Sequence, residues 1–507
     1  MTDLDRRSGR ADLAGRPEPG GWRAAAAGML RTNWLAAALL AAGLVLRVLA
    51  QLAYRPALFY IDTARYLHDN PPGMDPLGYG GIVRAVAPAA GLAGVAALQH
   101  LLGLAMAVVS YLLLRRRGVA RWLAAIAIAP VLLDGYQLQI EQTIMPDTAF
   151  EALIVAGLAI LLWRPGVTWR RALAAGAVLG ACATVAQVGE ALLLPAVAFV
   201  LAAAPGWRAA AGHAVTLGAA FAVPILAYSA GSYLLTGSFF LSHTGITSFY
   251  GRAAAAADCV TLRLPPAERG LCPTKAQQAR GPDWLEYGQG SPVRRYYDNP
   301  DRAQTDRQLS DFNHAVLGQQ PGRLLAAYGR DAVKLYELRR TTGAGDTPLS
   351  RWQFQAGFPY FPPWSSSHVV GEEIAQFGGG RPAVWRGAAA FLRSYQLGGG
   401  YTPGPLFAAC TLAGLAGAAV ALRRRAGPRV RQPALACLLC FGSAVFVLGV
   451  SDLFEFSWRY QLPALVTLVP AGALGTTAAA GVIRARRQAA RAPVPSPEPR
   501  APAPRSS

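Results

Sequence analysis

The chain has 507 residues, of which 53 % are hydrophobic and only 15 % are charged, and its formal net charge is +20. Soluble domains carry about 25 % charged residues, so this composition excludes an ordinary soluble protein and indicates an integral membrane protein. The basic residues lie in short clusters between apolar runs and at both ends, which is typical of membrane-protein loops and argues against nucleic-acid binding.

Ten apolar runs follow one another along the chain. A helix that crosses a bilayer needs about 20 mostly apolar residues. The candidate spans are 33–53, 92–114, 119–135, 146–163, 171–187, 189–205, 213–235, 404–422, 433–450 and 461–482. The third, fifth and sixth are short or closely spaced. We expect an all-α polytopic membrane protein with about ten transmembrane helices and a large extracytoplasmic segment of mixed structure.

The arginines give this bundle an orientation. Clusters precede the first span and follow the even-numbered spans, and they include Arg6, Arg7, Arg10, Arg16, Arg23, Arg31, Arg115, Arg116, Arg117, Arg164, Arg170, Arg171, Arg208, Arg423, Arg424, Arg425, Arg484, Arg486 and Arg487. Positive loops favour the cytoplasm, so both termini are expected there. The N-terminus has no small-residue cleavage site after its apolar run, so the first span is expected to remain as an anchor.

Five regions follow from these spans. They are a cytoplasmic basic tail (1–31), an N-terminal transmembrane module (32–236), an extracytoplasmic segment (237–403), C-terminal transmembrane helices (404–483) and a disordered cytoplasmic tail (484–507). Cys259 and Cys272 both lie in the extracytoplasmic segment, where oxidising conditions favour a disulfide; the alternative is two free thiols. The other four cysteines lie within spans and are interpreted as packing residues.

Carboxylates gather on the side opposite the arginine clusters. The stretch "FYIDTARYLHDNPPGMDPLGYGG" after the first span contains Asp62, Asp69 and Asp75; further acids of this side are Asp134, Glu141, Asp147, Asp452 and Glu455. Ionisable groups at membrane depth are costly and usually mark a site. We interpret Asp69 and Asp134 as ordinary solvated loop residues. Apolar and proline neighbours tie Asp62 and Asp147 closely to a span, so these two are candidate site residues.

These motifs, taken in order, resemble one family. Tyr60, Asp62 and Tyr66 match a "Tyr-x-Asp-x-x-x-Tyr" setting after the first span, and "MDPLGY" supplies Asp75 and Tyr79. "EQTIMPDTAF" supplies Glu141 and Asp147, and "WRYQLP" supplies Arg459 and Tyr460. The pattern resembles the polyprenyl-phosphate-sugar-dependent glycosyltransferases of the GT-C type, which include protein O-mannosyltransferases and lipid A aminoarabinose transferases. It covers roughly residues 30–200 and 450–480. The chain departs from some relatives at Leu77 and Gln187, so donor-phosphate binding is expected to be built differently.

The resemblance implies a site at the outer membrane surface. A hexose or pentose would pass from a polyprenyl-phosphate donor to a hydroxyl of a glycan, lipid or protein, with inversion. Asp62 would accept the hydroxyl proton and Asp147 would orient Asp62 or the acceptor. Arg459, and less directly Arg65, would bind the phosphate.

Other residues have supporting roles in this interpretation. Tyr60, Tyr66, Tyr79, Glu141 and Tyr460 would line the substrate site. No cofactor is required, although a divalent metal could be held by Asp75 and Glu141. The alternatives are a multispan transporter or flippase for a lipid-linked or anionic substrate, an O-antigen-type polymerase or ligase, and a scaffold without activity.

Overall fold

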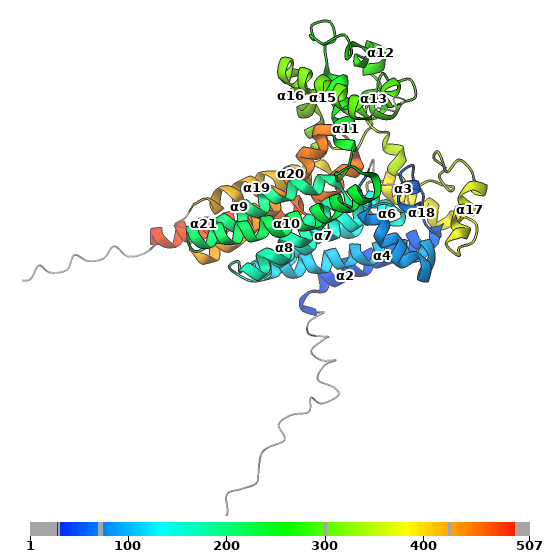
Figure 1. Cartoon of the computed structure of the whole chain (residues 1–507). Helices are drawn as coiled ribbons and strands as arrows, with labels where there is room; N and C mark the ends of the chain where they lie inside the picture. The colour runs from blue at the N-terminus through cyan, green and yellow to red at the C-terminus, as the bar shows by residue number, and fades with distance from the viewer. Residues whose placement is uncertain (1–27, 29–30, 69–74, 298–301, 424–426, 492–507) are drawn as a thin grey trace, which may run out of the picture.

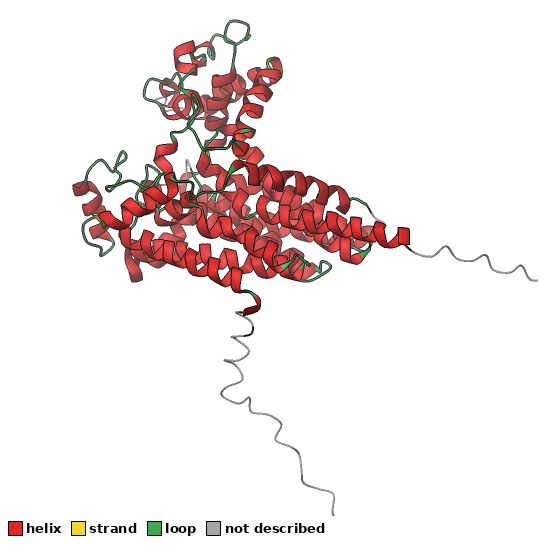
Figure 2. Cartoon of the chain, turned by 180° about the vertical axis from the view of Figure 1, so that it is seen from behind, coloured by secondary structure: helices red, strands yellow, loops and turns green. Residues whose placement is uncertain are grey.

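The structure, a computed structural model, describes residue 28 and residues 31–68, 75–297, 302–423 and 427–491 (Figure 1). Its regular structure is almost entirely helical, as the cartoon coloured by secondary structure shows (Figure 2). The helices form an elongated bundle, and a smaller group of helices projects from it near one end. The all-α polytopic fold class is therefore confirmed. The interpretations of Asp69 and of most of the two tails fall outside the described residues.

Each of the ten predicted runs coincides with a helix. The first part of the bundle contains α2 (Trp34–Ala53), the short α3 (Thr63–Leu67), α4 (Gly78–Arg116), α5 (Arg121–Leu133), α6 (Gly135–Gln142), α7 (Asp147–Leu162), α8 (Trp169–Val185), the 3-10 helix η1 (Gln187–Leu192), α9 (Leu193–Ala203) and α10 (Trp207–Thr236). The last part contains α19 (Gly404–Ala421), α20 (Pro428–Phe454), the 3-10 helix η5 (Trp458–Leu465) and α21 (Leu468–Arg491).

Among the described residues, six helical stretches are long and apolar enough to cross a membrane, namely α2, α4, α10, α19, α20 and the continuous pair of η5 and α21. The pair α5 and α6, bent by 48°, makes a seventh if it counts as one span. Helices α7, α8 and α9 are apolar but have only 16, 17 and 11 residues. The chain is therefore a multi-pass membrane protein, and the total of ten crossings stays a prediction.

Helix α4 begins at Gly78, well before the start that its apolar run predicts. It bends at Gly91, whose φ of 64° is readily adopted only by glycine, and Pro88 removes one backbone donor just before the bend. A Cβ at Gly91 would lie 3.3 Å from the carbonyl oxygen of Phe377. At the bend, the backbone of α4 therefore comes close to Phe377, the residue that follows α17 (Ser367–Gln376).

Residues 237–403 contain mostly helix rather than mixed structure. The elements are α11 (Thr244–Ala256), η2 (Arg269–Leu271), α12 (Lys275–Gln278), α13 (Gly281–Tyr287), α14 (Arg294–Tyr297), α15 (Arg302–Gln319), α16 (Pro321–Ala332), η3 (Lys334–Tyr336), η4 (Leu349–Trp352), α17 and α18 (Arg386–Leu397). The only sheet in the described residues pairs β1 (Tyr54–Arg55) with β2 (Ala383–Val384) in antiparallel register.

This segment consists of two parts. The helices from α11 to α16 enclose their own core, built around Tyr250, Leu309 and Phe312. The residues after them instead run over the end of the bundle, where Trp352 and Trp364 are buried in the bundle core. The second part thereby forms a cover over the loops that follow the first spans.

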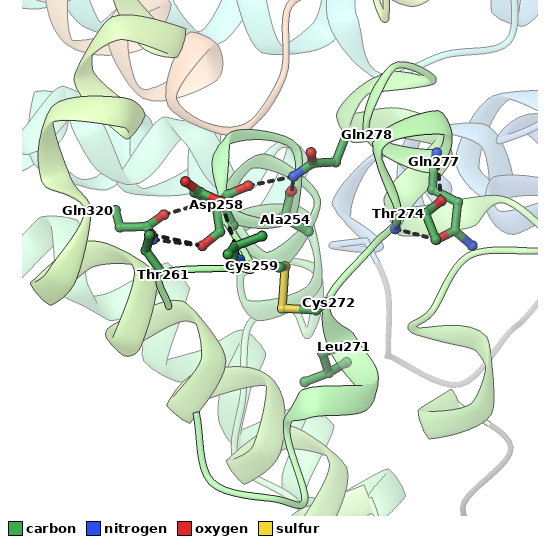
Figure 3. The surroundings of a disulfide bond; sticks show 12 residues. Ala254, Asp258, Cys259, Thr261, Leu271, Cys272, Thr274, Gln277, Gln278 and Gln320 are labelled. Atoms are coloured by element: carbon green, nitrogen blue, oxygen red, sulfur yellow. Dashed lines mark hydrogen bonds between the residues drawn. A yellow bond between two sulfur atoms is a disulfide. The ribbon is translucent and has the colours of Figure 1, made fainter. Parts of the chain in front are cut away.

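Cys259 and Cys272 form a disulfide in the first of these parts, the pairing that the sequence analysis expects (Figure 3). Beside it, Gln320 exchanges two hydrogen bonds with the backbone of Asp258, at 2.8 and 2.9 Å. The disulfide joins the end of α11 to the end of η2, and the Gln320 hydrogen bonds join the end of α11 to the start of α16. The four other cysteines are free and buried, which agrees with a packing role.

Candidate active site

Backbone pairing brings the first two outer loops together. The Leu58 amide donates to the Gln142 carbonyl at 2.8 Å, and the Ile144 amide donates to the Leu58 carbonyl at 3.0 Å. The hydroxyl of Thr63 also donates to the Ile144 carbonyl at 3.1 Å. Because Asp62 follows Leu58 and Asp147 follows Ile144, this short parallel bridge places the two carboxylates on the same side of the pairing.

Arg459 lies between these two carboxylates. Its Nε donates to Asp147 Oδ1 at 2.7 Å, and its Nη1 donates to Asp62 Oδ2 at 3.2 Å. Arg459 is buried at the beginning of η5, while Asp147 opens α7, where the helix dipole favours a negative charge. The structure therefore joins three predicted site residues from three distant parts of the sequence in one ion-pair cluster.

A second pair adjoins the first. Arg65, on α3, donates to the carboxylate of Asp75 and lies 3.8 Å from that of Asp62. Burial raises the pKa of the Asp75 carboxyl, although the neighbouring Arg65 opposes this effect. Asp62 is thus placed between two guanidinium groups, one of which it shares with Asp147 and the other with Asp75.

The predicted tyrosines surround this cluster in two ways. Tyr66 and Tyr79 are buried and pack edge to face with centroids 5.2 Å apart, and the Tyr79 hydroxyl donates to Gln99 at 2.7 Å. The Tyr460 ring lies 5.3 Å from the Arg459 guanidinium. Tyr60 is held by the Trp364 indole, which donates to its carbonyl at 2.8 Å. Tyr66 and Tyr79 therefore pack against each other in the core next to the cluster, whereas Tyr60 and Tyr460 flank its charged groups.

The segment 237–403 supplies site residues that were not predicted from the sequence. Arg351 donates to the Tyr60 hydroxyl at 3.1 Å and lies 3.6 Å from the Asp283 carboxylate. Trp352 packs on the Tyr60 ring at 4.6 Å and faces the Arg459 guanidinium at 5.4 Å. Arg351 and Trp352 come from η4 and Asp283 from α13. No spacing in the sequence signals them, because their relation to Tyr60 exists only after the segment folds over the bundle.

Further buried carboxyl groups lie around this region, two from the same segment and one from the loop after α20. Burial raises the pKa of Asp283, with Arg351 opposing and Asp62 reinforcing the shift. Burial also raises the pKa of Glu286 to about 7, although the Ser248 and Thr247 hydroxyls donate to its carboxylate. The pKa of Glu455 is well above its usual range because of burial and of the nearby Asp283 and Glu286. Several carboxyls around the site thus hold protons more tightly than in water.

Glu141 points away from this cluster and into the bundle. Its fully buried carboxylate accepts from Arg47 at 2.7 Å and contacts His100 at 2.9 Å. A Cβ at Gly103 would lie 2.2 Å from this carboxylate, so the glycine makes room for it. Glu141 is therefore placed as the charge partner of Arg47, not beside Asp62 as the expectation of a substrate contact requires.

The two residues proposed for a metal do not fit one. Asp75 is paired with Arg65, and Glu141 is paired with Arg47. Within the described parts of the chain, no three His, Cys, Asp or Glu side chains are grouped so that they could hold a metal ion. We therefore derive no step that passes through a metal.

Asp134 is not the solvated loop residue that its sequence suggests. It is buried, accepts from Arg340 at 2.8 Å and from the Thr402 amide at 2.8 Å, and caps α6 through the Tyr136 amide. Its partners lie more than two hundred positions away along the sequence. Asp134 thus anchors the segment 237–403 to the bundle, which a local sequence pattern does not reveal.

Comparisons with known proteins find little. No protein-family model and no curated protein matches the chain. One similar solved structure is the protein O-mannosyltransferase Pmt1–Pmt2 complex of S. cerevisiae bound to the sugar donor, with 20 % identity, a TM-score of 0.32, and coverage of 45 % of this chain and 36 % of that chain. Protein O-mannosyltransferases belong to the group that the sequence motifs resemble.

A second similar structure is the oligosaccharyltransferase AglB of Archaeoglobus fulgidus in complex with an inhibitory peptide and a dolichol-phosphate. The identity is 13 % and the TM-score 0.41, over 90 % of this chain and 52 % of that chain. This chain thus spans about a third and about half of the lengths of the two proteins. At these TM-scores neither similarity decides the fold or the chemistry of the chain.

Proposed function

We propose that the protein is a membrane glycosyltransferase that moves a sugar from a polyprenyl-phosphate donor to an acceptor hydroxyl on the extracytoplasmic side, with inversion. The observation that carries this proposal is the position of Arg459 between Asp62 and Asp147. A cation suited to phosphate and a carboxylate suited to a hydroxyl proton lie next to each other at the end of a membrane bundle. The lipid tail of such a donor would stay in the bilayer while its sugar meets water.

Arg459 would bind the donor phosphate by exchanging one partner. Its contact with Asp147 is short, at 2.7 Å, and ties the guanidinium to the start of α7. Its contact with Asp62 is longer, at 3.2 Å, and Asp62 is the more exposed of the two carboxylates. The phosphate would therefore displace Asp62 and leave the pair with Asp147 intact. Two N–H groups of a guanidinium match two phosphate oxygens well.

Displacement of Asp62 from Arg459 by the phosphate would also make the Asp62 carboxylate available as the general base. Once released from Arg459, the Asp62 carboxylate could accept the proton of the acceptor hydroxyl as its oxygen bonds to the anomeric carbon. The bond from that carbon to the phosphate oxygen breaks, its electron pair leaves with the polyprenyl phosphate, and Arg459 stabilises the resulting charge. A single displacement with one base inverts the anomeric centre.

The extracytoplasmic segment would close the site over the sugar. Trp352 and Tyr60 present aromatic rings next to Arg459, and Arg351 brings a further cation to the Tyr60 hydroxyl. Rings in this position exclude water and strengthen the charged contacts beneath them. In this interpretation Arg351 is the additional phosphate or sugar contact that compensates for the departure at Gln187.

The test is transfer from a radiolabelled polyprenyl-phosphate hexose or pentose by the purified full-length protein in lipid nanodiscs. We expect release of polyprenyl phosphate and a labelled product when membrane glycans, lipids or peptides are added as acceptors. Binding of the donor without release, together with movement of the donor between leaflets of proteoliposomes, would replace this proposal by a flippase. The absence of binding by any such donor would refute the role of the site altogether.

A further inference from the structure

A cavity with an excess of positive charge lies at the other end of the bundle. Its volume is about 290 Å³, and its lining includes Arg117, Arg164 and Arg431 together with Phe199, Gln432 and Leu435. Helix α4 runs from the candidate active site to this cavity, because it begins just after Asp75 and ends just before Arg117. Its 39 residues, at about 1.5 Å each, extend for about 58 Å before any loss at the bend. The cavity and the active site therefore lie near opposite membrane faces.

The arginines of this cavity have no carboxylate partner among the residues that the structure describes. Among the ion pairs of the described residues, none includes Arg117, Arg164 or Arg431. In the described part of the chain, the Arg117 side chain donates to the backbone carbonyls of Leu162 and Arg164 and to no carboxylate. Burial and the nearby Arg171 lower the pKa of Arg117 to about 10, which is the direction expected without a neighbouring carboxylate.

Arg431 has unused hydrogen-bonding capacity. Its Nη2 donates to the Ala202 carbonyl at 2.8 Å, while its buried Nε has no hydrogen-bond partner in the described part of the chain. A buried N–H without an acceptor is costly, so an acceptor group at this position would be favourable. The charge and the free donor both point to an anion.

Tryptophans place this end of the bundle at the level of lipid headgroups. Trp34, Trp122, Trp169 and Trp207 occur at the first or second residue of α2, α5, α8 and α10, and each is between 55 % and 76 % exposed. Trp163 follows the last residue of α7 and lies beneath the Arg116 guanidinium at 4.4 Å. Tryptophan collects at membrane–water interfaces, where its ring is apolar and its N–H remains hydrated.

We propose that this cavity binds the phosphate headgroup of an anionic membrane lipid. The arginines supply the charge, and Phe199 and Leu435 supply an apolar wall for the part of the lipid next to its headgroup. A soluble phosphate ion would use the charge but would gain nothing from that wall. The site is separate from the proposed glycosyl transfer and does not depend on it.

The experiment compares lipid retention by native mass spectrometry of the detergent-purified full chain. The probes are phosphatidylglycerol and phosphatidylcholine with the same acyl chains, and the variant is Arg164→Gln/Arg431→Gln. Arg208→Gln is the matched control, because Arg208 lies at the same end next to Trp207 but does not line the cavity. Each arginine near an anionic headgroup contributes about a fivefold factor in affinity, so the double variant should bind phosphatidylglycerol about 30-fold more weakly.

The expected result is preferential retention of phosphatidylglycerol by the parent and by Arg208→Gln, and loss of this preference in the double variant. Inorganic phosphate at millimolar concentration should not displace the lipid; displacement would assign the cavity to a soluble anion instead. Equal retention of the two lipids by the parent, or an unchanged preference in the double variant, would overturn the proposal. If the double variant does not fold, the parent comparison and the single Arg164→Gln variant, whose residue is exposed, decide the question.

Discussion

Replacing Arg459 by methionine would remove the cation that Asp62 and Asp147 share, and would leave Asp62 with only the more distant guanidinium of Arg65 at 3.8 Å. At 2.7 and 3.2 Å, and with an effective dielectric constant of about 20, the two attractions are about 6 and 5 kcal/mol before desolvation. Desolvation offsets much of this, and breaking a buried pair costs about 3–5 kcal/mol. Because Asp62 remains 22 % exposed, we place the loss at the lower end, about 3 kcal/mol.

A double-mutant cycle separates this coupling from lost packing. Asp147→Asn alone should also destabilise the protein, since it removes the shorter of the two contacts of Arg459. The combination of Asp147→Asn with Arg459→Met should cost about 2 kcal/mol less than the sum of the two single changes. Equilibrium unfolding in mild detergent, followed by tryptophan fluorescence, measures all four proteins. Additive losses would refute the idea that Arg459 is a shared charge partner.

Three further outcomes are expected. Arg351→Gln should weaken donor binding about tenfold in a filter-binding assay. The control is Arg381→Gln, which replaces an exposed arginine and should leave donor binding unchanged. Equal effects of the two substitutions would mean that Arg351 acts only through surface charge. Burial raises the pKa of Glu286 to about 7, so the folded state retains this proton where the unfolded chain has lost it. Stability of the helices α11 to α16 should therefore fall by up to about 3 kcal/mol as the pH rises from about 5 to about 8, and Glu286→Gln should flatten this slope in hydrogen exchange. Replacing Cys259 and Cys272 by serine should lower the stability of the same helices by up to about 3 kcal/mol, since the bond closes a loop of 13 positions, and limited proteolysis should then cut this region faster.

Apolar run length and the arginine clusters were enough to predict the bundle. Every predicted run is helical, because membrane helices need a long apolar stretch that the sequence shows directly. The start of α4 was missed by contrast, since Gly78 to Gly91 contains glycines and a proline and is apolar only in part. The backbone of α4 at Gly91 lies close to Phe377 of the segment 237–403, a contact that no local pattern records.

The candidate site was predictable to the extent that its residues belong to short motifs. Asp62, Asp147 and Arg459 come from three such motifs, and the structure brings them into contact. Arg351 and Asp283 reach the same place through a segment without a recognisable spacing, so only the fold reveals them.

For Glu141, in contrast, a motif identified the residue but not the contacts of its side chain. It belongs to a motif with Asp147, but the helical turn of α6 directs its side chain inward to Arg47 and His100. A motif thus shows which residues are neighbours along the chain, whereas the direction of each side chain depends on the local backbone.

The most direct test of the central claim compares Asp62→Asn with the parent in donor binding and in sugar transfer. The substitution keeps the size of the side chain and removes the proton acceptor. Loss of a general base typically slows a reaction by about 100- to 10,000-fold. We predict a loss of transfer in this range while the polyprenyl-phosphate donor still binds, because Arg459 holds the phosphate and keeps its contact with Asp147. Transfer by Asp62→Asn at nearly the parent rate would contradict the account and would remove Asp62 from the chemistry.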